Sequence, residues 1–378
     1  MTKFKRVILV VVEGLGLGAA PDAAVFSDSG ADTLGHLADH FRARLQLPTL
    51  QRLGLTALHP VAFTPPVVHE HSYYGRLRQM TSEKSAIEDY WELLGVVREQ
   101  DAAAYPSGFS AAFVHQLERQ FHRPVLVNAP YQPQHLLEDY GDVQVATGGL
   151  LVSTSGGSDM VVSAHEATVT GDEFTRLGRF IRHWFDEEGS SLLRQVTTRP
   201  FAGGPGRYYY RSVEQRIFYM RPPQPTVVDR VRAAHQPVRV IAGATVFSDL
   251  QMVLREDPAT GLYLVPVHEI DRAGYQRDPE KSGQHLMEVD RHLAEVLPLV
   301  RTNDLLLITA NHGNDPVFAG EGSTREWLPL LAYSPSLRGG RLADRSTLAD
   351  IAATIQEVLG LADDQARGYG HSFRSLLL

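Results

Sequence analysis

Short apolar runs and helical periodicity alternate at the two ends of the chain. Four runs rich in branched residues, at 7–12, 238–241, 305–308 and 328–332, have the near-continuous apolar sequence of parallel strands that are buried on both faces. Between 279 and 302, apolar residues recur with helical spacing directly before the run at 305. These patterns predict an α/β core with a mostly parallel central sheet and helices on both faces.

A further helix is predicted over residues 86–94. Ser85 and Glu88 have the spacing of a capping box, in which each side chain bonds a free amide of the first helical turn. The apolar run that follows stops at Gly95, a residue type that commonly ends helices. The helix therefore begins beside Ser85.

The middle of the chain has a different pattern. Glycine and proline clusters at 105–108, 147–157 and 201–206 interrupt shorter strand and helix patterns. A chain of 378 residues also suits two domains better than one. We expect an inserted α+β cap domain at 98–220 and a core domain formed by 1–97 and 221–378.

The composition of the chain limits which partners and which metal ligands are possible. The formal net charge of -8 argues against nucleic acid or an anionic membrane as the main partner, because both attract a basic surface. The chain has no cysteine, so any metal would need His, Asp, Glu or hydroxyl ligands. The first apolar run is far shorter than the ~20 residues of a membrane span, and no signal-peptide cleavage pattern follows it. We expect a cytoplasmic protein.

Polar residues stand where ligands bind in open α/β sheets, just beyond the carboxyl ends of the strands. Glu13 follows the run at 7–12, and Asn311 and His312 follow the run at 305–308. Taken alone these positions are weak indications of a metal site, since an acid at a strand end is more often a helix cap or a surface charge.

Eight sequence blocks, in order over nearly the whole chain, resemble phosphopentomutase. They are GAAPD (18–22), GADTLGH (30–36), LPTLQRLGL (47–55), YYG (73–75) with WE (91–92), SAHE (163–166), RPFAGGPG (199–206), LLLITANHGNDP (305–316) and TREWLPLLAYSP (324–335). The resemblance implies the core of the alkaline phosphatase superfamily with an inserted cap. It also implies transfer of a phosphate between the 1 and 5 positions of ribose or deoxyribose, with two manganese ions and a phosphorylated threonine. Two divalent ions would neutralise the phosphate and the developing charge.

The residues that the resemblance places in the first metal site are altered. Glu13 stands where the family has aspartate, which lengthens the side chain by one methylene group. Asn311 replaces a second aspartate by a neutral amide, and His312 is retained.

The nucleophile is also altered. In the alignment fixed by Trp91 and Glu92, the family's threonine corresponds to Ala86, with Ser85 beside it. Alanine has no hydroxyl group and cannot be phosphorylated.

The second metal site departs further from the family. Its aspartate corresponds to Ile270, or to Asp271 if the register slips by one residue. Its histidines correspond to Tyr275 and Ser323, and the segment 243–262 is shorter than in the family. In the cap, Ser155 keeps the hydroxyl of a sugar-contacting Ser-x-Asp motif whose acid becomes Gly157, and Arg199 matches a substrate-contacting arginine that could equally form a structural ion pair.

Our leading hypothesis is a catalytically inactive relative of phosphopentomutase with no cofactor, or Mn2+ if any metal is retained. Removing several members of a unit that acts together leaves little of the original mechanism. Such a protein could bind a phosphosugar or another protein.

Two alternatives stay open. In the first, the chain is a working but divergent phosphopentomutase in which Ser85 replaces the threonine and Glu13, Asn311 and His312 hold one ion. In the second, the site is rebuilt as a different metal centre around His268, Glu269 and Asp271. Convergence of these side chains would favour a metal site, and pairing with one another would favour the inactive relative.

Overall fold

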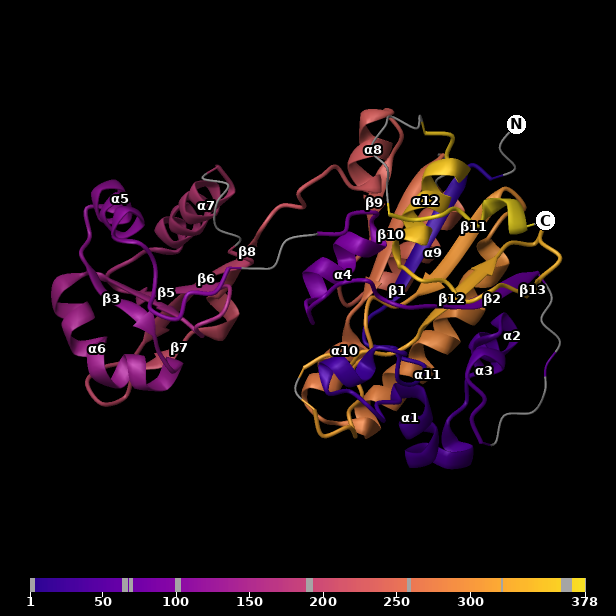
Figure 1. Cartoon of the computed structure of the whole chain (residues 1–378), viewed down its shortest axis with the longest axis horizontal. Coiled ribbons are helices and arrows are strands. Elements are labelled where there is room, and N and C mark those ends of the chain that lie inside the picture. Colours follow the sequence, from indigo (N-terminus) through magenta and orange to yellow (C-terminus); the bar gives the residue numbers. More distant parts are fainter. Residues whose placement is uncertain are drawn as a thin grey trace. The chain divides into compact units, whose positions relative to one another are not determined.

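The computed structural model of the chain describes residues 4–62, 67, 71–98, 103–187, 193–256, 260–320, 322–361 and 369–377. The chain divides into two compact units, one formed by Met1–Arg98 and Pro222–Leu378 and the other by Glu99–Arg221 (Figure 1). Within the described residues, no helix has the length and apolar character that crossing a membrane requires.

The first unit, the core domain, is built on a seven-stranded mixed sheet. Along the sheet the strands are β13 (Gly340–Arg341), β2 (Ser72–Leu77), β12 (Leu328–Tyr333), β11 (Asp304–Thr309), β1 (Arg6–Val12), β10 (Gly261–Val267) and β9 (Val238–Val240). Every residue of β1 and β11 is buried, as expected for strands covered on both faces. The structure thus has the α/β fold that the sequence predicts, and it shows a mixed sheet in each of the two units.

The strand at 328–332 differs from the prediction in its direction. β12 runs antiparallel to both of its neighbours, β11 and β2. The described residues between β11 and β12 form no crossover helix, and a parallel return normally needs one. A strand buried on both faces has the same apolar sequence in either direction, so the sequence pattern could not decide this point.

The apolar runs did not predict β10, although it lies beside the central strand β1. Pro266 interrupts its sequence, and a proline normally argues against a central strand. Pro266 is tolerated because it lies beyond Leu264, where the pairing with β9 ends. Its missing amide therefore removes no hydrogen bond to β9.

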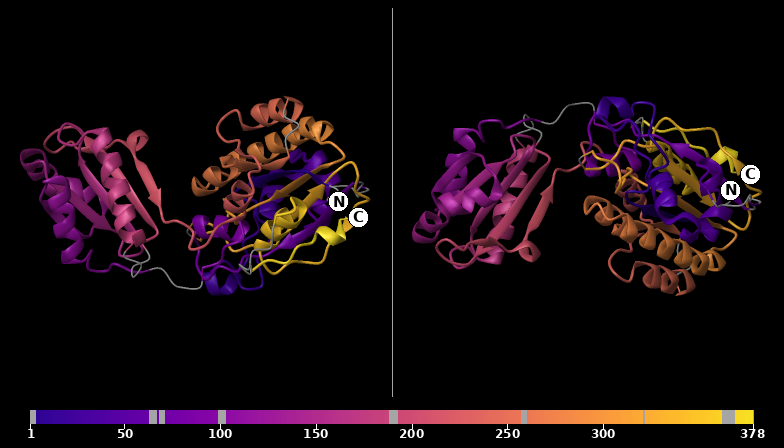
Figure 2. Two further views of the ribbon diagram at one scale, coloured as in Figure 1. Left: turned by 90° about the horizontal axis from the view of Figure 1, so that it is seen from above. Right: turned by 90° about the horizontal axis from the view of Figure 1, so that it is seen from below.

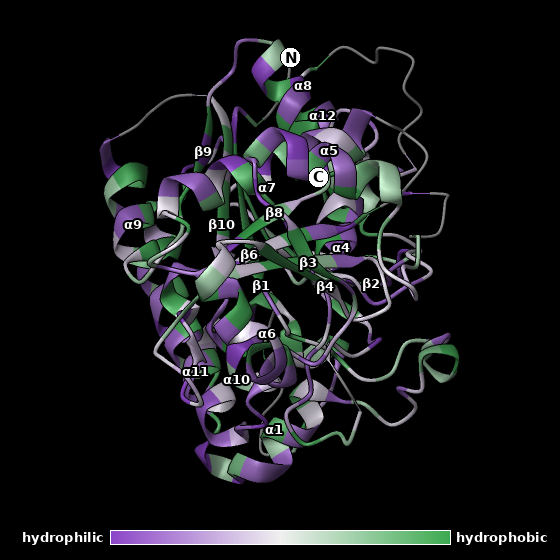
Figure 3. Ribbon diagram, turned by 90° about the vertical axis from the view of Figure 1, so that its left-hand side faces the viewer, coloured by the Kyte–Doolittle hydropathy of each residue, from purple (hydrophilic) through white to green (hydrophobic). Residues whose placement is uncertain are grey.

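Helices cover both faces of the core sheet (Figure 2). Helix α11 packs against α1, α2 and α9, and α12 packs on the opposite side against α4 and α8. Figure 3 shows α9 with both green and purple segments, the mixture expected of a helix that covers a sheet. The core helices are α1 (Thr33–Phe41), α2 (Pro48–Leu53), α3 (Leu55–Leu58), α4 (Ala86–Leu93), α8 (Val227–Ala233), α9 (Val246–Glu256), α10 (Glu269–Tyr275), α11 (Pro279–Val296) and α12 (Ala349–Val358), with short 3₁₀ helices at Ala23–Phe26, Arg42–Arg44, Leu297–Leu299 and Arg374–Leu376.

The second unit, the cap domain, has its own six-stranded sheet and two apolar clusters. Strands β3 (Val125–Pro130), β4 (Leu150–Thr154), β5 (Asp159–His165), β6 (Gln195–Ala202) and β7 (Tyr209–Tyr210) follow one another, and β8 (Arg216–Tyr219) also pairs with β6. The helices are α5 (Ala111–Phe121), α6 (Pro133–Thr147) and α7 (Gly171–Glu187), with a 3₁₀ helix at Ser212–Glu214.

A buried ion pair joins the first residues of β1 and β11. Arg6 and Asp304 are directly opposite in the parallel register. The Nε and Nη2 atoms of Arg6 donate to the two carboxylate oxygens of Asp304 at 2.9 and 2.5 Å, and both side chains are almost completely buried. The pair therefore fixes which residues of the two strands lie side by side.

We expect Asp304→Asn to lower the free energy of unfolding by about 3 kcal/mol, because it leaves the Arg6 charge buried without its partner. Urea unfolding of the purified protein measures this loss. The matched control is Asp344→Asn, which breaks the more exposed pair of Arg76 with Asp344 and should cost less than about 1 kcal/mol. Equal losses in the two variants would contradict the proposed role of the buried pair.

Candidate active site

The carboxyl ends of β1 and β11 bring Glu13 close to Asn311 and His312. The two strands are paired up to Val11 and Thr309, and the pairing resumes at Gly14 and Gly313. The amide of Asn314 donates to the Gly14 carbonyl oxygen at 2.9 Å. The strand ends that carry chemistry in this fold class are therefore adjacent.

The carboxylate of Glu13 is held by two side chains of the protein. Its Oε1 atom accepts a hydrogen bond from the hydroxyl of Tyr90 and lies 2.7 Å from Nδ1 of His268. Glu13 is 6% exposed, so these contacts replace most of the water that a free carboxylate would bind. Burial, together with the nearby Glu13 charge, raises the pKa of Tyr90, which keeps the phenol protonated and able to donate.

His268 is the basic side chain beside the Glu13 carboxylate. The hydrogen bond to Glu13 raises the pKa of His268 above its ordinary value, because the carboxylate stabilises the imidazolium form. The imidazole is about half exposed. His268 directly precedes α10, so the helix that follows β10 places it beside the end of β1.

Asp271 is also engaged by its neighbours. Its Oδ1 atom accepts a hydrogen bond from Nδ2 of Asn314 at 2.8 Å, and Nδ1 of His312 lies 3.8 Å away. The same Asn314 amide donates to the Asp271 carbonyl oxygen at 3.1 Å. The backbone of Asp271 also lies close to Gly14. A Cβ atom on residue 14 would be 2.9 Å from the Asp271 Cα atom, and the φ of +83° also favours glycine at this position.

Asn311 and His312 are buried beside these pairs and keep unpartnered polar atoms. Asn311 is fully buried, and neither its Oδ1 nor its Nδ2 atom has a hydrogen-bond partner among the described residues. Nε2 of His312 is likewise buried without a partner in the described part of the chain. Buried polar groups are nearly always hydrogen-bonded, so these three atoms require an explanation.

The positions that correspond to the family's second metal site offer little to a cation. Ile270 is completely buried and belongs to the apolar core of the domain. Tyr275, four residues after Asp271 in α10, is 55% exposed, and Ser323 is buried beside the 313–324 bridge. Only Asp271 among these four carries an anionic ligand atom, and Asn314 already donates to it.

The amino terminus of α4 is occupied by its own side chains. Ser85 is the N-cap, and its hydroxyl oxygen accepts from the Glu88 amide at 3.4 Å. Ala86 follows as the first helical residue and is exposed. Instead of closing the expected capping box, the Glu88 carboxylate pairs with Arg98 at 2.8 Å.

A second buried acid, Asp89, lies one residue further along α4. It is completely buried, and its Oδ1 atom accepts from the hydroxyl of Thr81 at 3.2 Å. Burial, and then the nearby Glu92, raises the pKa of Asp89 well above its ordinary value. Asp89 therefore favours the neutral acid.

In the cap domain, the two residues predicted to contact a substrate are Ser155 and Arg199. Each bonds to neighbouring side chains, and the two lie apart from each other. The backbone amide of Ser155 donates to Asp159 at 3.1 Å, and its hydroxyl also bonds that carboxylate. Arg199 donates from Nε to Gln215 at 3.0 Å and lies over the ring of Tyr210. Asp159 pairs with Gln195, four residues before Arg199 on β6, so Ser155 and Arg199 lie at different heights along the sheet.

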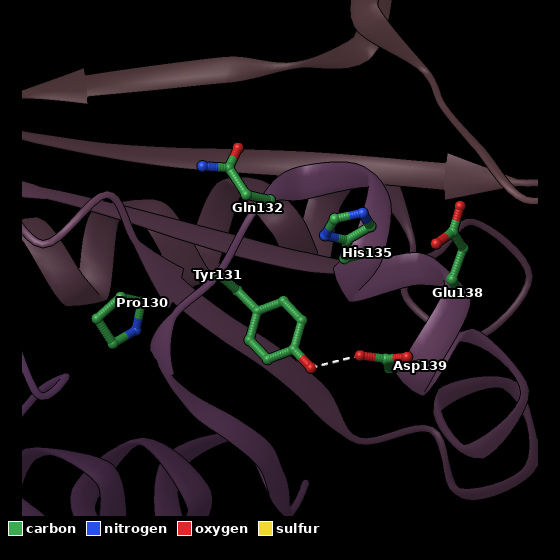
Figure 4. A pocket seen from close by; sticks show the side chains of 6 residues that line it. All are labelled: Pro130, Tyr131, Gln132, His135, Glu138 and Asp139. Carbon is green, nitrogen blue, oxygen red and sulfur yellow. Dashed lines mark hydrogen bonds between the residues drawn. The ribbon is translucent and has the colours of Figure 1, made fainter.

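One hollow on each unit can be placed relative to the predicted site residues. The hollow in the cap lies beside the strand end that precedes Ser155, because its lining residue Pro130 pairs with Thr154. In the cap, a hollow of about 350 Å³ at the start of α6 is lined by surface side chains (Figure 4). Figure 4 shows the Tyr131 hydroxyl directed at Asp139, with His135 and Glu138 on the same helix. In the core, a hollow of about 340 Å³ is lined in part by Tyr333, which pairs with Leu306 near the opposite end of β11 from Asn311.

Two of the candidate metal ligands, Glu13 and Asp271, are engaged by other side chains. Within the described ranges, no three His, Asp or Glu side chains form a group that could hold a metal ion. The rebuilt centre imagined from the sequence around His268, Glu269 and Asp271 therefore has no such group either. Glu13 is paired with His268 and Tyr90, and Asp271 accepts from Asn314, whereas Asn311 and Nε2 of His312 keep no hydrogen-bond partner among the described residues.

Sequence reasoning missed Tyr90, Asp89 and Asn314. Tyr90 and Asp89 look like ordinary residues of an amphipathic helix, and only the packing of α4 beside β1 brings the Tyr90 hydroxyl to Glu13. Asn314 belongs to the LLLITANHGNDP block at 305–316, three residues after the predicted ligand Asn311. Its position in a block shared with the family was the one indication available.

Comparison with known proteins identifies the family. The Metalloenzyme superfamily pattern matches residues 249–363. The chain is 36% identical to the phosphopentomutase of Levilactobacillus brevis over 396 aligned residues, which cover 98% of each protein. Whole-chain similarity to solved structures is lower: PH0037 protein from Pyrococcus horikoshii (10% identity, TM-score 0.46, 96% of this chain and 99% of that one) and phosphoglycerate mutase from Leishmania mexicana (10% identity, TM-score 0.43, 98% and 97%).

The relationship to the L. brevis enzyme extends over both units, and the sequence blocks that resemble phosphopentomutases lie along the same length. The chain therefore belongs to the phosphopentomutase family.

Proposed function

We propose that this chain is a phosphopentomutase-family protein that has lost metal-dependent phosphoryl transfer and acts by binding, with a phosphosugar or a partner protein as its ligand. One observation carries the proposal: the carboxylate of Glu13, which would bind a metal ion in the family, is paired with His268 and Tyr90. An acid that already has a cationic partner gains less from a divalent ion.

Part of the negative charge of the site already has a partner within the protein. Glu13 faces the imidazole of His268, whose raised pKa favours its positive form. Asp271 accepts from the amide of Asn314, and Asp89 favours its neutral form. A two-metal centre needs several anionic ligands to attract four positive charges, and here Glu13 is paired with a histidine while burial disfavours the charged form of Asp89.

The helix end where the family attaches phosphate is also unsuited to that step. Ala86 offers no oxygen, and the Ser85 hydroxyl caps α4. Helix amino termini attract anions, but here Glu88 and Asp89 already fill the first turn. A phosphate at this place would meet the carboxylate of Glu88, which already pairs with Arg98.

A second candidate function, a working but divergent phosphopentomutase, is favoured by the identity of 36% with an enzyme of that name. The unpartnered atoms of Asn311 and His312 lie beside Glu13, where a single ion would be held in this alternative. Ser85 would have to leave its capping position to accept a phosphate. The phosphosugar would then be a substrate as well as a ligand.

We expect no stoichiometric Mn2+ in protein purified with manganese present, because Glu13 and Asp271 are already paired. Plasma mass spectrometry measures the metal content, and calorimetric titration of the same sample measures binding. A variant carrying the family residues E13D, A86T, I270D, Y275H, N311D and S323H is the positive control, after its thermal unfolding shows that it folds. Stoichiometric manganese that disappears in Glu13→Ala or His312→Ala would falsify the proposal.

We expect no conversion of ribose 1-phosphate to ribose 5-phosphate above the rate without protein, because no hydroxyl replaces the missing nucleophile. The conversion is followed by phosphorus NMR with Mn2+ present, and a phosphopentomutase of known activity calibrates the assay. The matched variant is Ser85→Ala. Turnover by the natural chain that this variant abolishes would establish the divergent enzyme, whereas turnover that survives in it would indicate a contaminant.

A further inference from the structure

The hollow of about 340 Å³ on the core domain lies away from the candidate active site. Two of its lining residues, Arg52 and Leu53, belong to the last turn of α2. A third, Tyr333, ends β12 and pairs with Leu306, which lies five residues before Asn311, or roughly 16 Å along the strand. Small-molecule pockets have volumes of roughly 300–1,000 Å³, so this hollow is large enough for a small ligand.

Most of the lining of this hollow is apolar. Leu53 is almost completely buried, and Leu297 and the ring of Tyr333 are partly buried against the apolar core of the domain. Ala294 in the last turn of α11 and Pro298 just after that helix also line it. Apolar walls favour an apolar ligand surface, whereas the hydroxyl groups of a sugar would lose hydrogen bonds to water there. The walls therefore select a ligand with an apolar body.

The charge of the lining is positive. Arg52 lines the hollow, and none of the described residues that line it is acidic. Burial raises the pKa of Asp290, an acid close enough to Arg52 for the two charges to interact. The Asp290 carboxylate accepts from the backbone amides of Thr49 and Leu50 at 3.2 and 2.7 Å, at the start of α2. A guanidinium group binds a carboxylate through two parallel hydrogen bonds, so the lining suits a ligand with one carboxylate.

Tyr333 and His71 add polar groups to the lining. Burial raises the pKa of Tyr333 and the charge of Arg52 opposes this rise, so the phenol stays protonated and lies near the guanidinium group. Nδ1 of His71 lies 2.7 Å from the Leu337 carbonyl oxygen, and the Ser334 amide donates to the His71 carbonyl oxygen at 3.2 Å. These contacts hold His71 at a φ of +61°, a costly conformation for a residue other than glycine. The phenol can donate to an anion that Arg52 attracts.

We propose that this hollow is a second binding site of the chain, for a small organic acid with one carboxylate and an apolar body. The carboxylate pairs with Arg52 and accepts from the Tyr333 hydroxyl, while the body packs against Leu53 and Leu297. The residues that line the hollow include none of the predicted metal ligands or substrate contacts. The site is therefore independent of the proposed function, and either can fail without the other.

The first test is titration of the full chain with 4-fluorobenzoate, followed by fluorine NMR. We expect saturable binding, with weaker binding of 4-fluorobenzyl alcohol, which has the same apolar body but no charge. Ribose 5-phosphate should not displace the benzoate, because its hydroxyl groups do not suit apolar walls. Binding that does not saturate, equal binding of the alcohol, or displacement by ribose 5-phosphate would each overturn the proposal.

The second test locates the ligand in crystals of the full chain soaked with 4-bromobenzoate, with data collected at the bromine absorption edge. We expect an anomalous peak in the hollow and a carboxylate oxygen about 2.7–3.2 Å from a side-chain nitrogen of Arg52. A peak found only elsewhere, or no peak, overturns the proposal.

Two variants separate the charge of the site from its shape. Arg52→Gln removes the positive charge and should weaken 4-fluorobenzoate binding about fivefold, as the loss of an exposed ion pair does at most. Ala294→Phe fills the hollow and should abolish binding. Ala294 is exposed, so the larger side chain requires no repacking of the core, and thermal unfolding checks that both variants fold. Binding that survives unchanged in Ala294→Phe would contradict the proposed place of the ligand.

The matched control is Arg44→Gln. Arg44 is also exposed, and it pairs with Glu280 at the opposite end of α11 from Ala294. This variant should bind 4-fluorobenzoate as the natural chain does. Equal losses in Arg44→Gln and Arg52→Gln would show a general attraction of the anion to basic side chains and would overturn the proposal.

Discussion

The parallel pairing of β1 with β11 is the constraint on which the rest of the core depends. The bidentate pair of Arg6 with Asp304 sets the register at the start of these strands, and every residue along them is buried. A shift of one residue would turn each side chain to the opposite face. The same register brings Glu13 beside Asn311 at the carboxyl ends of the two strands. The ion pair at their amino ends therefore helps to set the geometry of the candidate site.

Within the site, two of the acidic side chains are stabilised by neighbouring protein groups. His268 and Tyr90 stabilise Glu13, and Asn314 stabilises Asp271. These partners come from α4, α10 and the loop after β11, so several elements are held together by one group of contacts. Such a network stabilises the carboxyl end of the sheet without an added ligand.

Asn311 and His312 are the exception, because their unpartnered atoms oppose stability in the folded chain unless a ligand satisfies them. Proteins often retain such costs at functional sites. In the cap, by contrast, the polar residues that resemble substrate contacts are engaged by neighbours on their own domain. Ser155 and Arg199 thus have hydrogen-bond partners, whereas Asn311 and Nε2 of His312 have none among the described residues.

The sequence indicated most of the central architecture. Apolar runs predicted β1, β11 and β12 as strands, because buried strands must be apolar whatever surrounds them. The run at 238–241 also contains a strand, β9, but the expected burial on both faces is wrong there, because β9 lies at the edge of the sheet with Arg239 and Val240 exposed. Helical spacing predicted α11, and capping chemistry predicted the start of α4 at Ser85. The order of sequence blocks indicated the phosphopentomutase family, which the relationship to the L. brevis enzyme confirms.

Tertiary structure decided the rest. The direction of β12 depends on how the chain returns after β11, and Pro266 fits into β10 only because pairing with β9 ends before it. The sequence also could not show that Tyr90 and His268 meet Glu13, since these residues come from elements far apart along the chain. By itself the sequence determined which side-chain types the site contains, because the chemistry of a side chain does not depend on the fold. Only the packing of the elements decided that Glu13 faces His268 and Tyr90, because this depends on where the side chains lie.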